Sequence, residues 1–404
     1  MKQYQLAMPQ QVFSGETGMQ ALESLAARHK KAAVFTDAGI RASGVLERPL
    51  AELDKAAVPY VVYDTLPAEP TCDQAQQVID TFRESGADLI VAVGGGSVMD
   101  IAKLASITAD GSCTVRDQLK NPRIGKKTVT TVMIPTTAGT GSEVDAGGVL
   151  SCEDNDEKLR LGDPRLFPVL SIVDPELMVS VPARLTAYQG FDALFHCVEC
   201  YISNTNTPMG DMVCREGIRR ASASLALVAS SIFLMNSSVS FWTLVCSRRT
   251  SSSESSSSRS SLAFANTLGG YAMDASGTTG SHGLEHGMSA HHHDLPHGAG
   301  LIMIARAYHT WMIDHGVAPE RYIDMARLMG NAAADDPHDF VIELTRLMEA
   351  CHVADLAMSE WGITVEELPA IAHNALTTNG VLFSHDPVTL TDPDVVEILK
   401  LSYR

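Results

Sequence analysis

The chain has 404 residues, of which 45% are hydrophobic and 19% charged, a composition typical of a globular protein. Its length predicts two domains. Its formal net charge of -18 argues against nucleic acid and anionic membranes as partners, because both would be repelled. The first residues hold no long apolar run, unlike a signal peptide, and the eight cysteines are scattered. We therefore expect a cytoplasmic protein with reduced thiols.

Short apolar runs alternate with amphipathic stretches over residues 1–181. The runs are 32–36, 60–63, 89–93, 131–135 and 170–173. Residues 73–85, between the second and third runs, have helical periodicity. Short apolar runs of this kind are typical of parallel strands covered by helices on both faces. This half predicts an α/β domain with a Rossmann-like parallel sheet.

The run LIVAVGGGSVMDIAK (89–103) predicts a strand, a glycine turn and a helix. Glycines such as Gly95 and Gly96 let a phosphate approach the backbone, and the N–H groups of the helix start favour an anion. Ser97 and Asp100 also form a capping-box-like pattern, so a structural role stays open. Three glycines exceed what a cap requires, which favours pyrophosphate binding.

A second loop, PTTAGTGSE (135–143), also follows a predicted strand. Its hydroxyl side chains suit ribose and nicotinamide contacts, and an ordinary polar turn is the alternative. Two such loops after parallel strands predict a dinucleotide cleft, although GxGxxG is absent. Asp37, after the first strand, is placed to bind a ribose diol and to repel a 2′-phosphate, which favours NAD over NADP. A simple turn aspartate is the alternative there.

Helical periodicity replaces the apolar runs beyond Val181 and predicts an all-helical domain over 182–404. The predicted helices are 187–203, 209–220, 298–315, 320–328, 340–351 and 365–375.

Residues 221–261 have an anomalous composition, with 17 serines in 41 positions. The part from Ala221 to Ser247 carries no charge and is long enough for a membrane span, but many serines interrupt it and no second span follows. We expect a flexible Ser-rich insertion. A shifted reading frame, corrected near Leu262, is a further hypothesis, which re-reading the gene in three frames tests.

Four polar residues in the helical half predict a metal site. Asp192 and His196 are four apart, so both project from one helix face, and His282 is followed by His297. Three imidazoles with one carboxylate suit Fe, Zn, Co or Ni better than Mg or Ca. The stretch HGLEH (282–286) also matches the inverted zinc-protease signature HxxEH, with Glu285 as general base. That alternative does not account for the glycine loops or Asp192.

Taken together, GGGSVMDIAK, PTTAGTGSEV, GFDALFHCVE and HGLEHGMSAHHHDLPHG resemble the iron-containing (group III) alcohol dehydrogenases. The resemblance covers nearly the whole chain outside 221–261. It implies a dehydroquinate-synthase-like fold, with an N-terminal nucleotide domain and a C-terminal helical metal-binding domain. It also implies NAD, and Fe²⁺ with Zn²⁺ as the alternative. The metal ligands that it implies are Asp192, His196, His282 and His297.

The resemblance also assigns the remaining site residues. His286 would be the catalytic residue, close to nicotinamide and substrate. The cofactor-binding residues would be Asp37, Gly95, Gly96, Ser97, Asp100, Thr136, Thr137, Thr140, Ser142 and Lys158.

The implied activity is hydride transfer between NAD(H) and a small primary alcohol or aldehyde, in a homo-oligomer. The alternatives are a dehydroquinate-synthase-type or glycerol-dehydrogenase-type enzyme, or an inactive nucleotide- and metal-binding variant. The chain departs from the family in three places. The Ser-rich segment 221–261 stands where the family has a much shorter, charged linker, so it replaces expected helical scaffold of the metal domain. His286 and His297 are eleven apart instead of ten, and Glu69 stands where the family often has asparagine.

Overall fold

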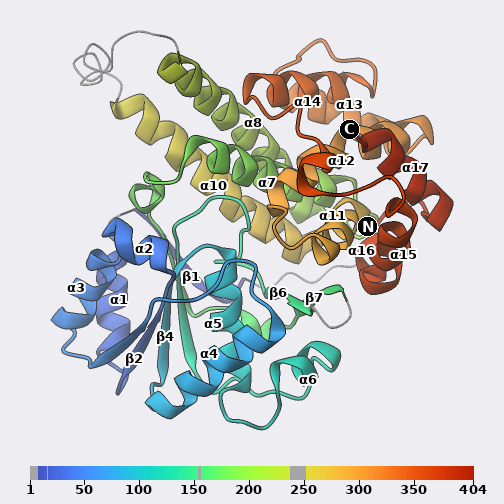
Figure 1. Cartoon of the computed structure of the whole chain (residues 1–404). Coiled ribbons are helices and arrows are strands. Elements are labelled where there is room, and N and C mark those ends of the chain that lie inside the picture. The colour runs from blue at the N-terminus through green and yellow to red at the C-terminus, as the bar shows by residue number, and fades with distance from the viewer. Residues whose placement is uncertain (1–7, 16, 153–155, 237–251) are drawn as a thin grey trace. The chain divides into compact units, whose positions relative to one another are not determined.

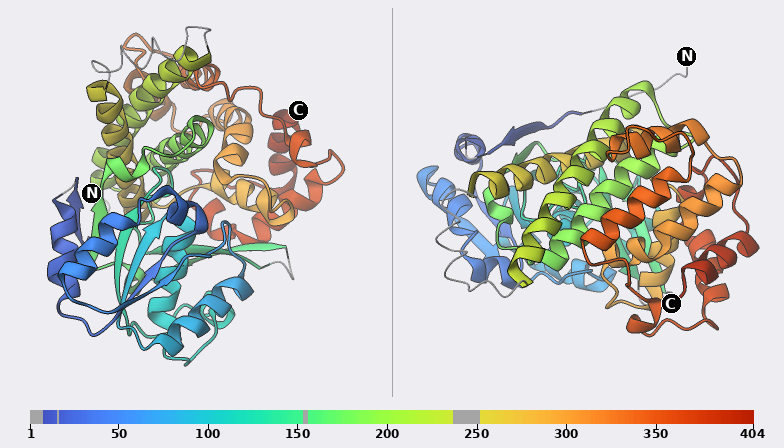
Figure 2. Two further views of the ribbon diagram at one scale, coloured as in Figure 1. Left: turned by 60° about the vertical axis from the view of Figure 1, so that its left-hand side comes forward. Right: turned by 90° about the horizontal axis from the view of Figure 1, so that it is seen from above.

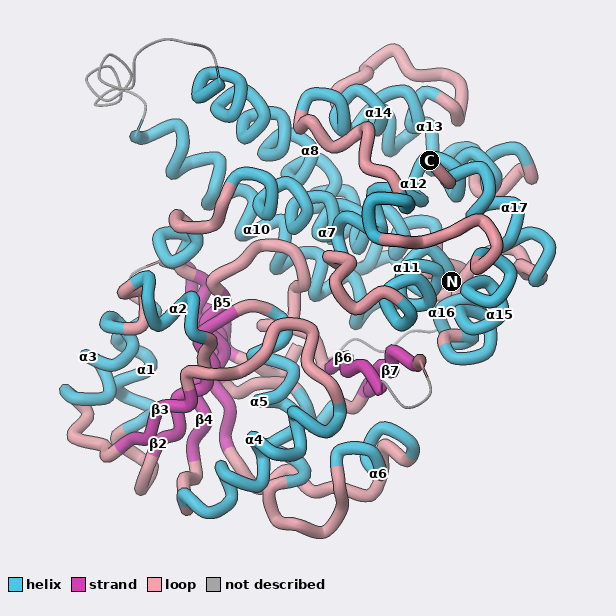
Figure 3. The backbone as a smooth tube through the Cα atoms, viewed as in Figure 1, coloured by secondary structure: helices cyan, strands magenta, loops and turns pink. Residues whose placement is uncertain are grey.

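The computed structural model describes residues 8–15, 17–152, 156–236 and 252–404. Contacts divide the chain into two compact units, which meet in sequence at Ser180 and Val181. The first is an α/β unit and the second is helical (Figure 1), which confirms the predicted fold class. Every strand in the described residues belongs to the first unit (Figure 3).

A six-stranded parallel sheet, in the order β1-β8-β5-β4-β2-β3, forms the centre of the α/β unit. The strands are β1 (Gln11–Ser14), β2 (Ala32–Phe35), β3 (Tyr60–Tyr63), β4 (Leu89–Gly94), β5 (Thr130–Pro135) and β8 (Leu170–Val173). All five predicted strands are present. The sixth, β1, lies at an edge with mostly exposed side chains, so it lacks the apolar run that marks the others.

Helices cover both faces of this sheet. They are α1 (Gly18–Ala26), α2 (Ala38–Ser43), α3 (Glu47–Lys55), α4 (Cys72–Ser85), α5 (Gly96–Thr108) and α6 (Val115–Lys120), with short 3-10 helices at Pro164–Leu166 and Pro175–Met178. Val34 belongs to the core formed with α1 and α3, whereas its neighbour Phe35 belongs to the core formed with α4 and α5. Consecutive strand residues are therefore buried on opposite faces, which explains the uniformly apolar runs.

The α/β unit also contains an antiparallel hairpin and a disulfide that the sequence did not predict. The hairpin pairs β6 (Gly147–Cys152) with β7 (Glu157–Gly162). Cys152, at the end of β6, is bonded to Cys72 at the start of α4. The expectation of reduced thiols is therefore wrong for this pair, because the fold brings together two residues 80 apart in sequence.

The second unit is made of helices, coloured from green to red in Figure 2. They are α7 (Ala183–Ile202), α8 (Pro208–Asn236), α10 (Ser252–Ser276), α11 (Gly280–His291), α12 (His297–Asp314), α13 (Pro319–Leu328), α14 (Asp339–Ala350), α15 (Leu368–Thr378), α16 (Gly380–Phe383) and α17 (Asp392–Ser402), with a 3-10 helix at Met358–Trp361. Each predicted helix has a counterpart, and α8 runs well past the predicted end at Arg220.

The Ser-rich stretch is helical where the structure describes it. Residues 221–236 continue α8 and residues 252–261 begin α10, so a flexible insertion is wrong for these parts; 237–251 lie outside the described residues. Serine costs little in a helix, and burial of Leu225 and Leu262 beside α7 outweighs that cost. No described helix is long and apolar enough to cross a membrane.

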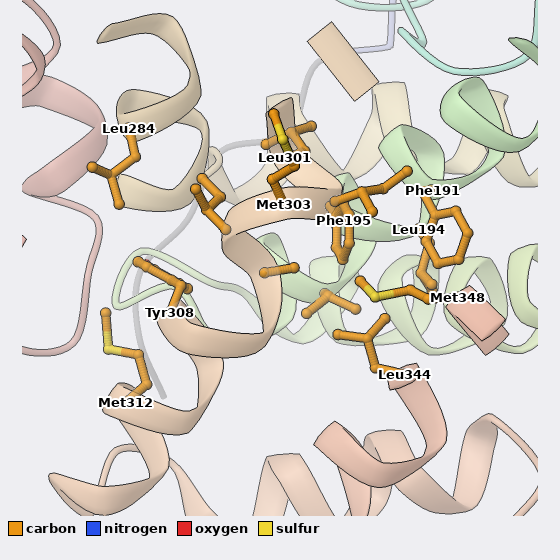
Figure 4. Packing of buried hydrophobic residues seen from close by; sticks show 14 of the residues in the cluster. Phe191, Leu194, Phe195, Leu284, Leu301, Met303, Tyr308, Met312, Leu344 and Met348 are labelled. Carbon is orange, nitrogen blue, oxygen red and sulfur yellow. The ribbon is translucent and has the colours of Figure 1, made fainter. Parts of the chain in front are cut away.

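Helix α7 is buried over almost its whole length. Its aromatic residues Phe191 and Phe195 lie in one core with residues of α12 and α14, such as Met303 and Met348 (Figure 4). A helix enclosed on all sides is expected to be apolar all round. The polar residues of its buried part therefore require an explanation.

Candidate functional site

Three polar side chains lie on one face of α7. Asp192, His196 and Glu199 are spaced i, i+4 and i+7, and all three are buried. This spacing places them at successive heights along the helix. The sequence predicted the first two as metal ligands and missed Glu199, although its position on the same face was a readable signal.

The structure brings the four predicted metal ligands together. Asp192 Oδ1 lies 3.5 Å from His196 Nε2, 3.4 Å from His282 Nε2 and 3.6 Å from His297 Nε2. The ligands come from α7, α11 and the first residue of α12. Three imidazole nitrogens thus converge on one carboxylate oxygen.

These residues fit a divalent transition metal. Their separations exceed the 2.7 to 2.9 Å of a charge-assisted hydrogen bond but match the roughly 3.4 Å between ligands of a tetrahedral ion bound at about 2.1 Å. Asp192 Oδ1 and His282 Nε2 are also buried without a hydrogen-bond partner among the described residues. Buried polar atoms without partners are costly, and an ion would satisfy both.

The electrostatics of the cluster favour a cation. Burial alone would raise the pKa of Asp192, but attraction to His196 and His297 outweighs it and holds that pKa below its usual range. Burial lowers the pKa of His196 to about 4, which leaves its imidazole neutral. Burial also opposes charge on His282, yet Glu199 and Asp192 raise its pKa to about 10. The same carboxylates would attract a metal ion at Nε2.

His286 lies beside the cluster with a different hydrogen-bond partner. Its Nδ1 is 3.2 Å from Asn379 Oδ1, and its ring centre is 5.6 Å from that of His297. Glu285, His286 and His297 also form a second group with converging ligand atoms. Glu285 Oε2 contacts His297 Nδ1, and the carboxylate is fully buried. This contact gives Glu285 a partner other than the water that a protease base would activate.

Three of the predicted cofactor residues, Asp37, Gly95 and Gly96, lie where the strand order of the α/β unit reverses. From β2 the chain goes to β3 on one side, and later strands β4, β5 and β8 lie on the other. Open parallel sheets bind nucleotides at such a point, beyond the carboxyl ends of the strands. Asp37 lies two residues after the end of β2, and Gly95 and Gly96 follow β4 directly.

The two glycine-containing loops are in direct contact. A Cβ at Gly95 would lie 3.3 Å from Thr137 Oγ1, and one at Gly96 would lie 2.7 Å from Thr140 Cγ2. Thr136 Oγ1 is buried without a hydrogen-bond partner among the residues that the structure describes. The loops therefore form one cradle with a polar atom in need of a partner.

Other predicted cofactor residues have bonds within the protein. Asp37 caps α2 by accepting from Ile40 N–H at 2.9 Å. Ser97 Oγ accepts from Glu69 N–H at 3.1 Å, and Lys158 Nζ lies 3.0 Å from Glu69 Oε2. Glu69, which the sequence analysis named only as a departure from the family and not as a cofactor residue, thus connects the cradle to the β6–β7 hairpin.

A buried network supports the second loop. Ser142 donates to Asp100 Oδ1 at 2.7 Å and accepts from Lys103 Nζ at 2.8 Å. Asp100 Oδ2 accepts from Val149 N–H at 2.9 Å, and Lys103 also pairs with Asp145. Both oxygens of Asp100 are engaged in this way. Lys103 and Asp145 were missed, since nothing in the sequence marks a lysine as fully buried.

Comparisons with known proteins identify the family of the chain. The family model described as iron-containing alcohol dehydrogenase matches residues 9–175, and its C-terminal counterpart matches 244–403. A NAD-dependent methanol dehydrogenase of Bacillus methanolicus is 26% identical over 376 residues, which is 92% of each chain. A 1,3-propanediol dehydrogenase of Citrobacter freundii is 28% identical over 381 residues, covering 93% of this chain and 92% of its own.

Among solved structures, an archaeal alcohol dehydrogenase from a Red Sea brine pool matches with a TM-score of 0.87. The match covers 100% of both chains at 24% identity, which shows a shared fold. The two family models together match most of the sequence, including the glycine loops and His282, His286 and His297. The chain therefore belongs to the iron-containing alcohol dehydrogenase family.

Proposed function

We propose that this protein transfers a hydride between NAD(H) and a small primary alcohol or aldehyde, using a metal held by Asp192, His196, His282 and His297. The convergence of three imidazole nitrogens on Asp192 Oδ1 carries this proposal. The names of the relatives support it, since one acts on methanol with NAD and another on 1,3-propanediol.

The ligand set suits this chemistry. When bound, a divalent ion supplies Lewis acidity, which favours loss of the proton from an alcohol and polarises an aldehyde carbonyl. Among the four ligands, Asp192 contributes one negative charge and each imidazole, when it binds in its neutral form, none, so the ligands alone half-neutralise a doubly charged ion. We propose Fe²⁺ as the native metal. Zn²⁺ suits the same ligands, so supply also decides which ion is bound.

The remaining residues bind the cofactor and move the proton. Gly95, Gly96 and Ser97 would hold the pyrophosphate, and the threonines of the second loop the nicotinamide half. Oxidation of the alcohol yields an aldehyde, a hydride that passes to NAD⁺, and a proton. We assign the relay of that proton to His286, whose ring is oriented by Asn379.

Metal content and turnover, measured together, test the proposal. Protein loaded with Fe(II) should oxidise NADH in the presence of short aldehydes. Asp192→Ala and His282→Ala should lose both bound metal and turnover, whereas Glu343→Gln, which changes the partly buried partner of the exposed Arg346 on α14, should keep both. Full activity of metal-free protein would contradict the proposal. Turnover without net change in NADH would indicate a lyase, and bound metal and NAD without turnover an inactive variant.

A further inference from the structure

Helix α11, which carries His282, begins without a capping side chain of its own. Its N-cap residue, Thr279, makes no side-chain capping bond. Instead Glu199 of α7 accepts from Thr279 N–H at 3.0 Å, and Asp386 accepts from Gly280 N–H at 3.2 Å. The unpaired N–H groups and the dipole of a helix start favour such carboxylates. Two distant acidic residues thus fix where α11 begins, and with it the position of His282.

Glu199 also contacts the side chain of His282. Its Oε1 lies 2.7 Å from His282 Nδ1, and the carboxylate is fully buried. The opposite ring nitrogen, Nε2, is the one that lies 3.4 Å from Asp192 Oδ1. An acceptor at Nδ1 keeps the ring proton there and leaves the lone pair of Nε2 for a metal.

Glu199 is itself held in place by a polar chain. Its Oε2 lies 3.1 Å from Thr279 Oγ1, which is 3.0 Å from the hydroxyl of Tyr308 on α12. Tyr308, labelled in Figure 4, also contacts Asp386. All of these side chains are buried, so water does not compete for the bonds.

Glu285 repeats this arrangement for His297. Its Oε2 contacts His297 Nδ1, and the opposite nitrogen of His297 lies 3.6 Å from Asp192 Oδ1. A Cβ on Gly300 of α12 would lie 2.8 Å from Glu285 Cγ. Helix α12 therefore approaches so closely that position 300 must be glycine if Glu285 is to keep this place.

We propose that Glu199 and Glu285 are positioning residues that fix the orientation and tautomer of His282 and His297, so that both present Nε2 to the metal. The inference rests on the proposed metal site. It assigns a role to two buried carboxylates that are not ligands in the set of four. It also explains why Glu285 lies within HGLEH without being a protease base.

Binding of Co²⁺ to metal-free protein tests this role without turnover. We would titrate Co²⁺ against a competing chelator and record the visible absorption of the bound ion. Glu285→Ala should weaken Co²⁺ binding about 10- to 100-fold and change the absorption spectrum. Glu285→Gln keeps an acceptor for His297 Nδ1 in a side chain of the same size, so it should lose less Co²⁺ affinity than Glu285→Ala. Glu199→Gln should lose more Co²⁺ affinity than Glu285→Gln. Glu199 uses one oxygen for His282 Nδ1 and the other for Thr279 N–H, and an amide has only one oxygen.

Unfolding of each metal-free variant separates positioning from a role in folding alone. A purely structural role would lower the unfolding temperature but leave Co²⁺ affinity and absorption unchanged in folded protein, and that outcome would overturn the inference. If Glu285→Ala does not fold, the Co²⁺ affinity and absorption of the nearly isosteric variants Glu285→Gln and Glu199→Gln decide between the two roles. Glu343→Gln is the control. Failure of the unmodified protein to bind Co²⁺ would instead refute the proposed function.

Discussion

Gly96 is the position at which one added methyl group should most directly disturb nucleotide binding. A Cβ there would lie 2.7 Å from Thr140 Cγ2 and 3.2 Å from Thr140 Cβ, where ordinary contacts begin at 3.4 Å. Forcing a methyl group into such a contact costs about 1 to 3 kcal/mol. Because the two loops of the cradle touch at this point, Gly96→Ala should push them apart. We expect the Kd for NADH to rise about tenfold, which corresponds to about 1.4 kcal/mol.

A second substitution shows whether the contact itself is responsible. Thr140→Ser removes Cγ2 but keeps the hydroxyl that accepts from Ser142 N–H at 3.3 Å. The double variant should therefore recover most of the NADH affinity, and Thr140→Ser alone should bind nearly as the unmodified protein does. NADH fluorescence titration gives the Kd, and thermal unfolding shows that the variants are folded. Unchanged NADH affinity in folded Gly96→Ala would refute this reasoning.

Three further predictions concern the disulfide, the proton relay and the half-buried Lys127. Reduction of Cys72–Cys152, which closes a loop of 80 residues, should lower the free energy of unfolding by about 4 kcal/mol in denaturant titrations; equal stability with and without reductant would contradict this. His286→Gln should lower kcat about 100-fold at unchanged metal content, whereas loss of metal would identify His286 as a ligand. Burial and repulsion from Lys103 lower the pKa of Lys127 to about 8, below its usual 10.5, so the protonated form destabilises the fold. Between pH 8 and pH 10.5 the free energy of unfolding should therefore rise more steeply in the unmodified protein than in Lys127→Met. Equal dependence of the unfolding free energy on pH in the two proteins would contradict this prediction.

The parts of the fold that were predictable are those in which local pattern and burial agree. Strands such as β4 are buried on both faces, so their apolar runs are visible in the sequence. The i, i+4 spacing of Asp192 and His196 predicts a shared helix face, and α7 provides it. The helix over residues 221–236 was not predicted, because the Ser-rich composition did not indicate it, whereas the burial of Leu225 beside α7 supports it.

The positioning residues could not be inferred with the same ease, because their roles depend on contacts between distant segments. Glu199 meets His282 and Thr279 about eighty residues later, and only the fold shows that it caps α11. Glu285 was visible within HGLEH, but its partner depends on how closely α12 approaches. The pairing of Cys72 with Cys152 likewise needs the neighbouring segments Thr71 and Ser151 to meet.

The most direct test of the central claim is a single titration in which Fe(II) bound per chain and NADH-linked aldehyde reduction are measured on the same samples. The account predicts that activity rises in proportion to bound metal, reaches its limit at about one ion per chain, and disappears on chelation. Asp192→Ala should show neither bound metal nor activity. Full aldehyde reduction by metal-free protein, or by Asp192→Ala, would contradict the account.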